Sequence, residues 1–487
     1  MIGFNQIPPN LRTPGVHIEF DSSLANAGSQ NFKMLVLGQR LAAGTVAEGV
    51  PTLVTDKEQA AAAFGAGSML AVMCAAMLAA SNTVELWAIA LDDNGAGTAA
   101  AGTITVSNAP TENGTYSLYI GGERIQVAVT STDTTDNVAT AIAAAITASV
   151  DCPVSAVVNG GTTNQVDLTA KHKGEYGNDI DLRSNYFGEG MPTGLTIAFG
   201  AMATGAGNPD IATAIIAMAD EQYNWIAMPW GDTANLAALN TELDDRWGPM
   251  RQIDGRAFAA YQGTLAATGT FGNGLNNEHL SVIGTGDSPQ PPYLWAAVNC
   301  AVAATSLIVD PARPLQTLSL IGILGPAVGD RWTRAERNTL LYDGIATFTV
   351  SASGEVLIER QVTTYQTNGA GQADASYLDI NTPETLSRLR YEQRQMFGLR
   401  YPRHKLADDG ANYSAGQPII TPKAAKGELL ALFSDLIERG WVEGYDAYKA
   451  TLIVERDIAD RNRLNFTDQP NLVNQLRVVA GKSQFVV

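Results

Sequence analysis

The chain has 487 residues, of which 45% are hydrophobic and 16% are charged, and its net charge is −18. That length predicts about two to four domains whose cores need no disulfide or metal, and the acidity argues against a nucleic-acid binder, which normally carries a basic field. The low share of charged side chains suggests that copies of the chain cover much of its surface. The net charge lies entirely in residues 1–330, which carry 12 basic and 30 acidic residues, whereas residues 331–487 carry 19 of each.

Neither an export signal nor a membrane span is expected. The N-terminus lacks the apolar segment of a signal peptide and places two prolines where that segment would need a helix. The longest apolar stretch, Leu294 to Val309, has 16 residues and contains Asn299, whereas a membrane span needs about 20, so we expect a buried helix there. Three widely separated cysteines argue against a disulfide framework and favour core thiols in a reducing compartment: Cys74, Cys152 and Cys300.

Residues 1–22 are predicted to form an extended N-terminal arm. Prolines interrupt any helix there, and Val16, Ile18 and Phe20 alternate with polar residues, as in a single strand that has no hairpin partner. Such a strand must pair with a sheet elsewhere, in the same subunit or in another.

Residues 23–99 and 205–330 are predicted to form one α/β domain. Strand-like runs, such as those that begin at Lys33 and Trp225, alternate with helical stretches. This alternation is typical of a largely parallel sheet with helices packed on it.

Two helix signals lie in the first part of this domain. Thr55 to Glu58 has the capping-box pattern of a helix start. The methionines between Met69 and Met77 recur at helical spacing, and core packing explains them better than a ligand site does.

Residues 100–204 are predicted to form a β-rich domain inserted into the α/β domain. Gly- and Ala-rich passages flank it, as linkers at domain boundaries do, and its two ends should lie close together. Gly121 and Gly122 separate two alternating runs and indicate a two-residue hairpin turn. An apolar stripe at helical spacing predicts one helix: Val138, Ile142, Ile146 and Val150.

Residues 331–470 are predicted to form an α+β domain. Thr333 to Glu336 is a second capping box, and a hairpin turn is expected at Ser353-Gly354. Thr382 is expected to cap a helix whose first residue is Pro383, and Gly440 is expected to end a further helix.

Residues 471–487 are predicted to form an extended C-terminal arm. Fully extended, this segment reaches about 55 Å at a rise of 3.3 Å per residue. It is therefore long enough to reach a neighbouring subunit.

The sequence contains no constellation that indicates catalysis, a cofactor or a metal. The histidines and cysteines lack metal-site spacing, and neither a P-loop nor a nucleophile elbow nor a zinc-protease motif is present. Ser288, His279 and Asp287 make a Ser/His/Asp set only on paper, because such residues abound in any chain of this length. We therefore expect no enzymatic activity.

An arginine-rich helix is expected over residues 383–397. Glu384 and Arg388 form a favourable pair four residues apart, whereas Arg390 and Arg394 repel each other at the same spacing. Such a face requires acidic partners, which either its own subunit or a neighbouring subunit supplies.

Several long segments resemble the contractile tail sheath proteins of Mu-like bacteriophages. The likeness is strongest at the N-terminal arm and from Asp310 to the C-terminus, and weakest over residues 100–204. The segments are TPGVHIEFD from Thr13, DPARPLQTLSL from Asp310, ERNTLLYDGIATFTV from Glu336, IERQVTTYQTN from Ile358, YLDINTPETLSRLRYEQRQMFGLRYPRHKLADDG from Tyr377 and PNLVNQLRVVAG from Pro470.

The resemblance implies a structural protein of the virion tail that has no cofactor. It implies hexameric rings of the chain itself, stacked as a helical sheath around the tail tube protein. Baseplate and tail terminator proteins are the further partners implied, with no direct nucleic-acid contact and no membrane insertion. Assembly is expected in the cytoplasm of the host bacterium, and contraction is expected to drive the tube through the host envelope.

The resemblance also implies that terminal arms of neighbouring subunits add strands to the sheet of the C-terminal domain. The arm residues expected to do so are Val16, Ile18, Phe20, Leu476, Val478 and Phe485. Candidate contacts with the tube or a neighbour lie on the polar faces of helices 383–397 and 424–439: Arg388, Arg390, Arg394, Lys426 and Glu428.

Two alternatives stay open. The sheath of a phage-derived bacteriocin or secretion machine is physically the same device without a genome. An α/β enzyme is suggested by the parallel-sheet pattern, although fold pattern alone does not confer activity.

Overall fold

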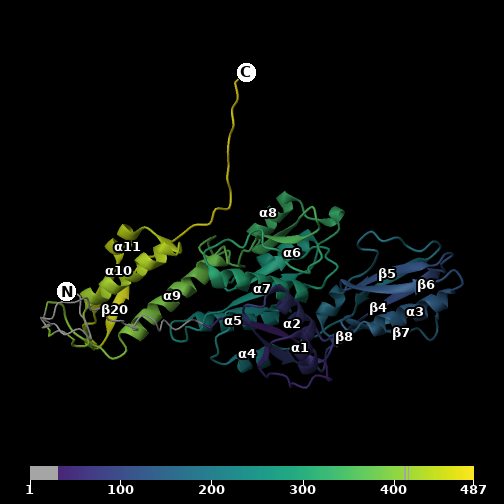
Figure 1. Cartoon of the computed structure of the whole chain (residues 1–487), viewed down its shortest axis with the longest axis horizontal. Helices are drawn as coiled ribbons and strands as arrows, with labels where there is room; N and C mark the ends of the chain where they lie inside the picture. Colours follow the sequence, from purple (N-terminus) through teal and green to yellow (C-terminus); the bar gives the residue numbers. More distant parts are fainter. Residues whose placement is uncertain (1–30, 411–412, 415, 487) are drawn as a thin grey trace, which may run out of the picture. The chain divides into compact units, whose positions relative to one another are not determined.

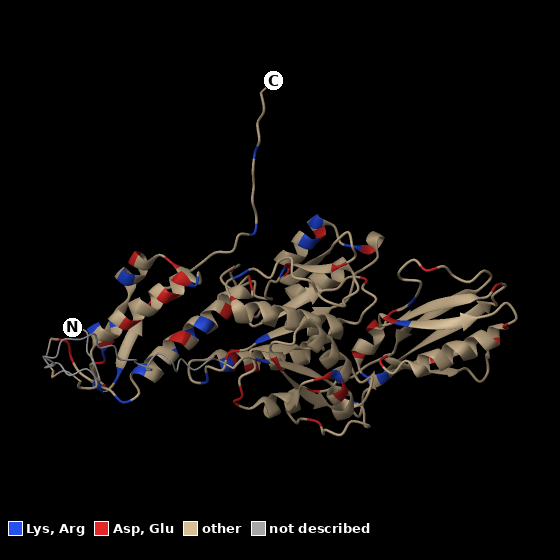
Figure 2. Ribbon diagram, in the orientation of Figure 1, with Lys and Arg blue, Asp and Glu red and all other residues tan. Residues whose placement is uncertain are grey.

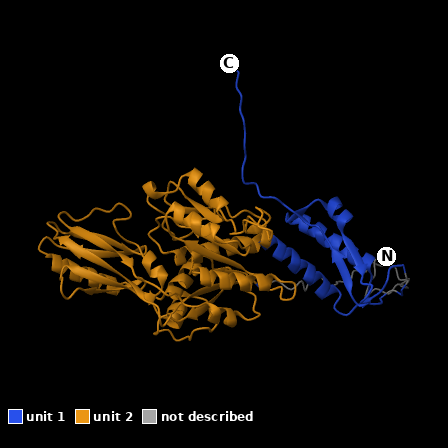
Figure 3. Ribbon diagram, turned by 180° about the vertical axis from the view of Figure 1, so that it is seen from behind, with its two compact units in different colours: residues 1–31, 384–487 blue, residues 32–383 orange. Residues whose placement is uncertain are grey.

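The computed structural model describes residues 31–410, 413–414 and 416–486. The chain divides into two compact units (Figure 3): unit 2 is Phe32–Pro383, and unit 1 holds Met1–Asn31 and Glu384–Val487. The predicted N-terminal arm, with Val16, Ile18 and Phe20, lies outside the described residues.

An eight-stranded sheet forms the centre of unit 2 (Figure 1). Its strand order is β15-β14-β13-β12-β11-β1-β3-β2, and the strands from β14 to β3 run parallel to their neighbours. The parallel strands are β1 (Lys33–Gln39), β3 (Glu85–Leu91), β11 (Trp225–Ala227), β12 (Arg256–Tyr261), β13 (Leu280–Gly284) and β14 (Ile345–Val350), and the antiparallel edge strands are β2 (Thr52–Val54) and β15 (Val356–Arg360). The central strands are buried along most of their length, as strands covered on both faces are. The predicted parallel sheet is confirmed.

The helices of this α/β part include one long apolar core helix. The helices are α1 (Lys57–Phe64), α2 (Met69–Ala80), α4 (Ala212–Met218), α5 (Thr233–Trp247), α6 (Leu265–Asn273), α7 (Pro292–Val309) and α8 (Arg334–Tyr342). α2 and α7 pack against each other and against central strands of the sheet. Of the described helices, α7 alone is long and apolar enough to cross a membrane, but 72% of it is buried inside the protein. It is the buried helix that the sequence predicts, and the methionines of α2 are likewise core residues.

The helix starts agree with the sequence in part. Thr333 caps α8, and its predicted capping box with Glu336 is confirmed. α1 is capped instead by Asp56, whose side chain accepts a hydrogen bond from the Gln59 N–H, so the box predicted to start at Thr55 is wrong. The carboxylate of Asp56 lies one residue closer to the helix and satisfies the free N–H there.

A β-rich domain is inserted after β3. Its elements are β4 (Ala99–Asn108), β5 (Gly114–Ile120), β6 (Glu123–Val129), α3 (Thr135–Ala148), β7 (Val154–Val158), β8 (Gln165–Lys173), the short 3₁₀ helix η1 (Glu175–Asp179), β9 (Leu182–Ser184) and β10 (Thr196–Ala203). They form a four-stranded sheet, β10-β4-β8-β7, and a three-stranded sheet, β6-β5-β9, which share a separate core with α3. The two ends of the insert lie side by side, because Thr98 pairs with Ala206.

The predicted hairpin of the insert is confirmed, but the predicted helix is shorter. Gly121 and Gly122 have positive φ values of 58° and 84° and form the two-residue turn between β5 and β6. α3 buries the first three residues of the predicted stripe. It ends at Ala148, so Val150 is 55% exposed and lies outside the stripe.

Residues 331–383 belong to unit 2, which differs from the domain boundary expected at residue 331. The predicted hairpin around Ser353-Gly354 is confirmed, and it joins β14 to β15. β14 pairs in parallel with the buried strand β13, with Val282 opposite Ile345. Because main-chain pairing ties this segment to the α/β sheet, the compact unit continues to Pro383.

Unit 1 is built from three helices and short strand pairs in its described part. The helices are α9 (Asn381–Arg400, which begins in unit 2), α10 (Pro422–Glu438) and α11 (Tyr445–Thr451), and the strand pairs are β16 (Lys405–Leu406) with β17 (Ile419–Ile420), β18 (Val442–Glu443) with β21 (Asn471–Leu472), and β19 (Ile453–Arg456) with β20 (Leu464–Thr467). In its small core, the rings of Phe433 and Tyr448 stack with centroids 3.7 Å apart. Gly440, with φ 74°, ends α10 as predicted, and the Trp441 N–H closes the cap on the Leu436 carbonyl.

α9 begins two residues earlier than predicted. Its first residue is Asn381, so Thr382 lies inside the helix and is not its cap. The Asn381 side-chain amide donates to the carbonyls of Pro311 and Arg313, each at 2.8 Å. These partners are about 70 residues away in the chain, and the local pattern that predicts a helix start carries no information about them.

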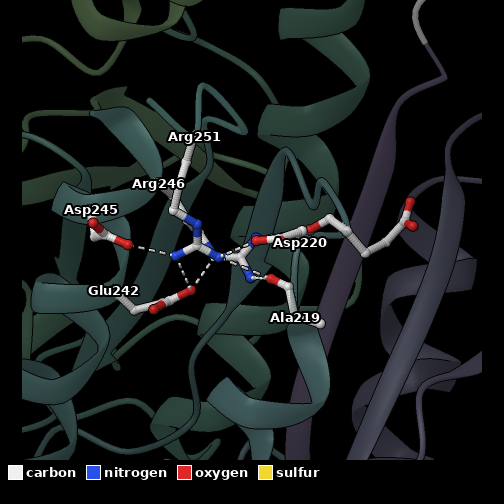
Figure 4. Close-up of polar contacts among 7 residues, drawn as sticks. Ala219, Asp220, Glu242, Asp245, Arg246 and Arg251 are labelled. Carbon is white, nitrogen blue, oxygen red and sulfur yellow. Dashed lines mark hydrogen bonds and ion pairs between the residues drawn. The ribbon is translucent and has the colours of Figure 1, made fainter. Parts of the chain in front are cut away.

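A cluster of ion pairs joins α5 to the loop after α4 (Figure 4). Arg246 is 1% exposed and donates to Glu242 at 2.6 Å and to the Ala219 carbonyl. Arg251 donates to Glu242 and Asp220, each at 3.0 Å, and to the same Ala219 carbonyl at 3.1 Å. Ala219 has a φ of 40°, a conformation that is costly for a residue with a Cβ atom. The two guanidinium groups therefore hold a strained turn in place.

Replacement of Arg246 by Met should lower the free energy of unfolding by roughly 3 kcal/mol, because the mostly buried Glu242 carboxylate loses its most buried partner. Arg251→Met is the matched control, and it should cost only about 1 kcal/mol, since that side chain is 25% exposed. Urea unfolding followed by circular dichroism measures both variants. Equal losses would show that burial does not determine what each arginine contributes.

A cavity of about 620 Å³ lies where the insert meets the loops after β12 and β13. Asp179, at the end of η1, lines this cavity together with Asp181 and Asp287. Burial, followed by the nearby Glu175 carboxylate, raises the pKa of Asp179 to about 7. Ionised Asp179 is therefore destabilising in the folded protein.

Asp179→Asn should stabilise the protein at pH 8 and change it little at pH 4. The unfolded aspartate ionises near its ordinary pKa of about 4, whereas the folded one keeps its proton up to about pH 7. The free-energy cost of ionising Asp179 in the folded protein therefore grows from about pH 4 to about pH 7, and it reaches at most ~4 kcal/mol above pH 7. Thermal unfolding of the two proteins between pH 4 and 8 tests this, with Asp287→Asn, at a side chain that is 61% exposed, as the control. Parallel pH curves for wild type and Asp179→Asn would contradict the raised pKa.

Candidate assembly surfaces and the closed sheet crevice

Proteins with a parallel α/β sheet usually bind a ligand in the crevice beyond the carboxyl ends of the strands, at the point where the strand order reverses. Here the chain runs from β1 to β3 on one side and from β11 through β12 to β13 on the other, so the reversal lies between β1 and β11.

Side chains of the protein itself occupy this crevice. Gln39, the last residue of β1, is fully buried and donates to Asp93 and to the Lys173 carbonyl, each at 2.7 Å. Lys173 ends β8 of the insert, and η1 follows it. Tyr176 of η1 packs edge-on against Tyr293 of α7, with ring centroids 5.6 Å apart. The insert therefore covers the carboxyl end of β1 at the reversal point, whereas the cavity lined by Asp179 lies beyond β12 and β13.

The structure does not assemble the Ser/His/Asp set into a catalytic arrangement. The Ser288 hydroxyl donates to the Leu324 carbonyl at 2.8 Å and accepts from the Trp295 indole at 2.9 Å. The His279 ring packs on Trp247, with centroids 5.1 Å apart. Each member serves the local packing of unit 2.

The buried thiols and the described acidic and histidine side chains form no metal centre. Burial raises the pKa of the Cys152 thiol to about 11 and raises those of Cys74 and Cys300 further, which makes all three unreactive at neutral pH. Across residues 31–410, 413–414 and 416–486, no group of three or more His, Cys, Asp or Glu side chains is placed to hold a metal ion.

Two of the predicted surface contacts of unit 1 are engaged within the subunit. The Lys426 ammonium group donates to the Leu452 carbonyl at 2.6 Å. Glu428 accepts a hydrogen bond from the Tyr401 hydroxyl at 2.7 Å and pairs with Arg400 of α9. The bonds of Glu428 join α10 to the end of α9, so the subunit itself supplies some of the acidic partners that α9 requires.

The predicted arginines of α9 differ in exposure. Arg388 is half-buried, and its guanidinium lies 5.8 Å from the centre of the Trp441 ring. Burial lowers the pKa of Arg388. Arg390 is also half-buried, whereas Arg394 is exposed, so Arg394 is the member of this set best placed to meet another protein.

Trp441 is an organising residue that the sequence analysis misses. Arg439 lies over its ring at 5.2 Å and also pairs with Glu392 of α9 at 2.7 Å. Cation–π contacts of this kind add stability where the ring and the cation are partly desolvated. Arg439 and Trp441 are two residues apart at the end of α10, so the sequence could have indicated their contact. The contact of Arg388 with Trp441 could not be predicted, because these two residues are far apart in the sequence.

In the two-stranded sheets of the described part of unit 1, each strand has one edge without a partner strand. β19 and β20 pair only with each other among the described elements, as do β18 and β21. Ile453 of β19 is 57% exposed and Phe466 of β20 is 39% exposed. Such edges present free main-chain N–H and C=O groups, together with apolar surface, to an added strand.

Residues 473–486 form an extended C-terminal segment that starts beside β21 (Figure 1). The Val473 N–H donates to the Trp441 carbonyl and continues the pairing of β18 with β21 for one further bond. Beyond it, Leu476, Val478 and Phe485 are 75%, 76% and 88% exposed. Apolar side chains so placed have no cover within the described part of unit 1.

The charges follow the division into units (Figure 2). Residues 32–383 carry 15 basic and 34 acidic residues, whereas residues 384–487 carry 15 basic and 13 acidic ones. The acidity of the chain therefore belongs to unit 2, and the C-terminal part of unit 1 is close to neutral.

Comparison with known proteins gives matches over the whole chain. The family models for the central and the C-terminal domains of phage tail sheath proteins match residues 204–364 and 372–486. The chain is 44% identical over 489 residues to the Mu-like prophage FluMu tail sheath protein of Haemophilus influenzae, with 100% of both chains covered.

Two solved structures match the chain at low identity. The PVC sheath complex of an extracellular contractile injection system, in its contracted state, matches with a TM-score of 0.50 at 10% identity over 98% of each chain. A sheath tail protein from Desulfitobacterium hafniense matches with a TM-score of 0.49 at 13% identity, over 94% of this chain and 100% of the other.

The full-length identity confirms the resemblance to contractile tail sheath proteins that the sequence shows. The chain belongs to the phage tail sheath family and is a structural protein, not an enzyme.

Proposed function

We propose that copies of this chain stack as hexameric rings, in a helical array, and form the contractile sheath around a phage tail tube. One observation carries this proposal most directly. The described part of unit 1 combines strand edges that have no partner strand with an extended segment, residues 473–486, whose apolar side chains are exposed from Leu476 onward. A chain that exposes both a strand donor and a strand acceptor is suited to join its own copies.

The arms are the proposed links between subunits. Residues Leu476, Val478 and Phe485 of one copy would lie on a two-stranded sheet of the next, with main-chain bonds giving affinity and side chains giving register. The N-terminal residues Val16 and Ile18 would add a second strand in the same way. Such pairing tolerates a rigid-body rearrangement, because the strands stay bonded while flanking residues absorb the change in dihedral angles.

Contraction would then be driven by conformation. The extended sheath would be metastable, and the contracted one would gain contact area between subunits, so each copy contributes a few kcal/mol once the baseplate starts the process. The tube would be driven through the host envelope by this shortening.

The tail tube protein, the baseplate and the tail terminator are the proposed partners. Assembly would take place in the cytoplasm of the host bacterium, and the mature protein would reside in the virion tail. The residues proposed to meet the tube or a neighbour are the polar ones of α9 and α10: Arg388, Arg390, Arg394, Lys426 and Glu428. Arg394 leads this set, because it is exposed in the subunit.

A second candidate is the sheath of a phage-derived bacteriocin or secretion machine. The fold shared with the PVC sheath complex favours it, and the Mu-like prophage relative favours the phage tail. The physical device is the same in both.

Deletion of residues 474–487 should abolish assembly into tubes or rings and leave the subunit folded. The deletion keeps the bond between Val473 and Trp441 and, among the described residues, removes exposed side chains apart from the half-buried Gln475 and Arg477, which pair with each other. Electron microscopy and sedimentation report assembly, and circular dichroism reports the fold.

The matched point variants test whether apolar docking is the cause. Phe485→Asp should weaken assembly at least about tenfold in critical concentration, since an apolar anchor is lost, whereas Gln484→Asp, at the neighbouring position, should have a much smaller effect. A truncated chain that assembles like the wild type would refute the proposed link.

Arg394→Glu should reduce co-assembly with the tube protein by about tenfold or more, because a charge that meets the partner is reversed. Lys449→Glu, on an exposed position of α11, makes the same charge change elsewhere on unit 1. Co-sedimentation with preformed tubes measures both. If the two variants behave alike, α9 does not provide the tube contact.

A further inference from the structure

A buried histidine joins the insert to the α/β core. His172 lies on β8 and is 4% exposed. Its Nε2 atom lies 3.1 Å from the main-chain nitrogen of Met69, the first residue of α2, and its Nδ1 atom lies 3.0 Å from an oxygen of Asp93. Three segments, from both sides of the junction, therefore meet on one imidazole ring.

The hydrogen bonds fix the protonation of this ring. Met69 can only donate, so Nε2 is the acceptor and carries no proton. Nδ1 is then the donor to the Asp93 carboxylate. The bond also satisfies one of the main-chain N–H groups that a helix start leaves without an intrahelical partner.

Asp93 holds the other end of the contact. It accepts from His172, from the Gln39 side chain at 2.7 Å and from the Lys173 main-chain nitrogen at 3.0 Å. Burial raises the pKa of Asp93, but the hydrogen bonds from His172 and Lys173 outweigh it, so the pKa lies below its ordinary value. Asp93 stabilises the junction above its unfolded pKa of about 4 and loses this effect only below it.

The backbones approach closely beside this ring. A Cβ atom added to Gly67, two residues before α2, would lie 1.9 Å from the Val150 carbonyl oxygen and 2.6 Å from the Lys171 ammonium group of the insert. Gly67 also has a φ of 72°. The turn before α2 therefore lies in close contact with the insert, with no room for a side chain at position 67.

We propose that His172 is an acid-sensitive latch between the insert and the core of unit 2. While the imidazole is neutral, it ties β8 to the start of α2. A proton on Nε2 turns this atom from a hydrogen-bond acceptor into a donor, so that it can no longer accept from the Met69 N–H. The positive imidazolium then also lies at the positive end of the α2 dipole, which repels it. Imidazole side chains in general change charge between pH 5 and 8. Uptake of a proton by this ring breaks its bond to α2 and loosens the insert there.

The surrounding titratable groups do not produce the same change. The ammonium groups of Lys171 and Lys173 donate to the main-chain carbonyls of Val150 and Gly95. These bonds are the same whether the His172 ring is neutral or protonated. Burial holds the pKa values of Tyr176 and Tyr293 well above 10, so both phenols stay neutral. Asp179 takes up a proton in this interval, but that removes an unfavourable charge and tightens the insert, which is the opposite sign.

Hydrogen–deuterium exchange on the full chain tests the latch at the bond itself. The Met69 amide, corrected for its intrinsic chemical rate, should lose about tenfold in protection between pH 7.5 and pH 5, as expected for one buried hydrogen bond. His172→Gln should show less than about a twofold change, because a glutamine amide accepts from Met69 and donates to Asp93 but takes up no proton. His172→Leu should leave the Met69 amide poorly protected at every pH.

The protection of the Met69 amide in wild type and in His172→Gln tests the proposal even if the His172→Leu variant does not fold. Equal acid sensitivity in both proteins would overturn the proposal, because the proton would then act elsewhere. Unchanged protection of Met69 in wild type from pH 7.5 to 5 would overturn it as well, and so would full protection in a folded His172→Leu variant.

Discussion

Closure of the crevice at the carboxyl end of β1 is the constraint on which much of unit 2 depends. The doubly wound order creates this crevice between β1 and β11, and an open crevice there would leave the end of Gln39 in water. Gln39 instead donates to Asp93 and to the Lys173 carbonyl of the insert, and Tyr176 of the insert packs edge-on against Tyr293. A fold common to many enzymes thus has its crevice occupied by its own side chains.

Unit 1 follows the opposite logic. The sheets in its described part have two strands each, which is marginal for a sheet without further pairing. Stability comes instead from α9 and α10, joined by Arg400 with Glu428 and by Arg439 with Glu392, and from Trp441 under two guanidinium groups. These contacts keep the unit folded while its strand edges stay available. If copies join through strands, as proposed above, the subunit has to be stable before those strands are added.

The sequence predicts what local patterns determine. The parallel sheet, the hairpin at Gly121-Gly122, the box at Thr333 and the end of α10 at Gly440 each depend on residues within one turn or strand, and each is confirmed. The start of α9 depends on Asn381 reaching Pro311, and the His172 contact depends on Met69, 103 residues away. No periodicity reports pairings of that separation. The closed crevice escapes prediction for the same reason, because it arises only when two domains fold together.

The distribution of charge favours unit 1 as the source of the proposed attraction between copies. With 15 basic and 34 acidic residues, the unit 2 parts of neighbouring copies repel each other over a Debye length of about 8 Å at physiological salt. A sheath nevertheless needs its subunits within contact distance. Short-range terms, namely main-chain pairing and apolar burial, can supply the attraction, and residues 384–487 suit them because their charges nearly cancel. If the lattice shortens as proposed, the repulsion between copies grows and the contact area must grow faster, so screening by salt would favour the compact state over the extended one.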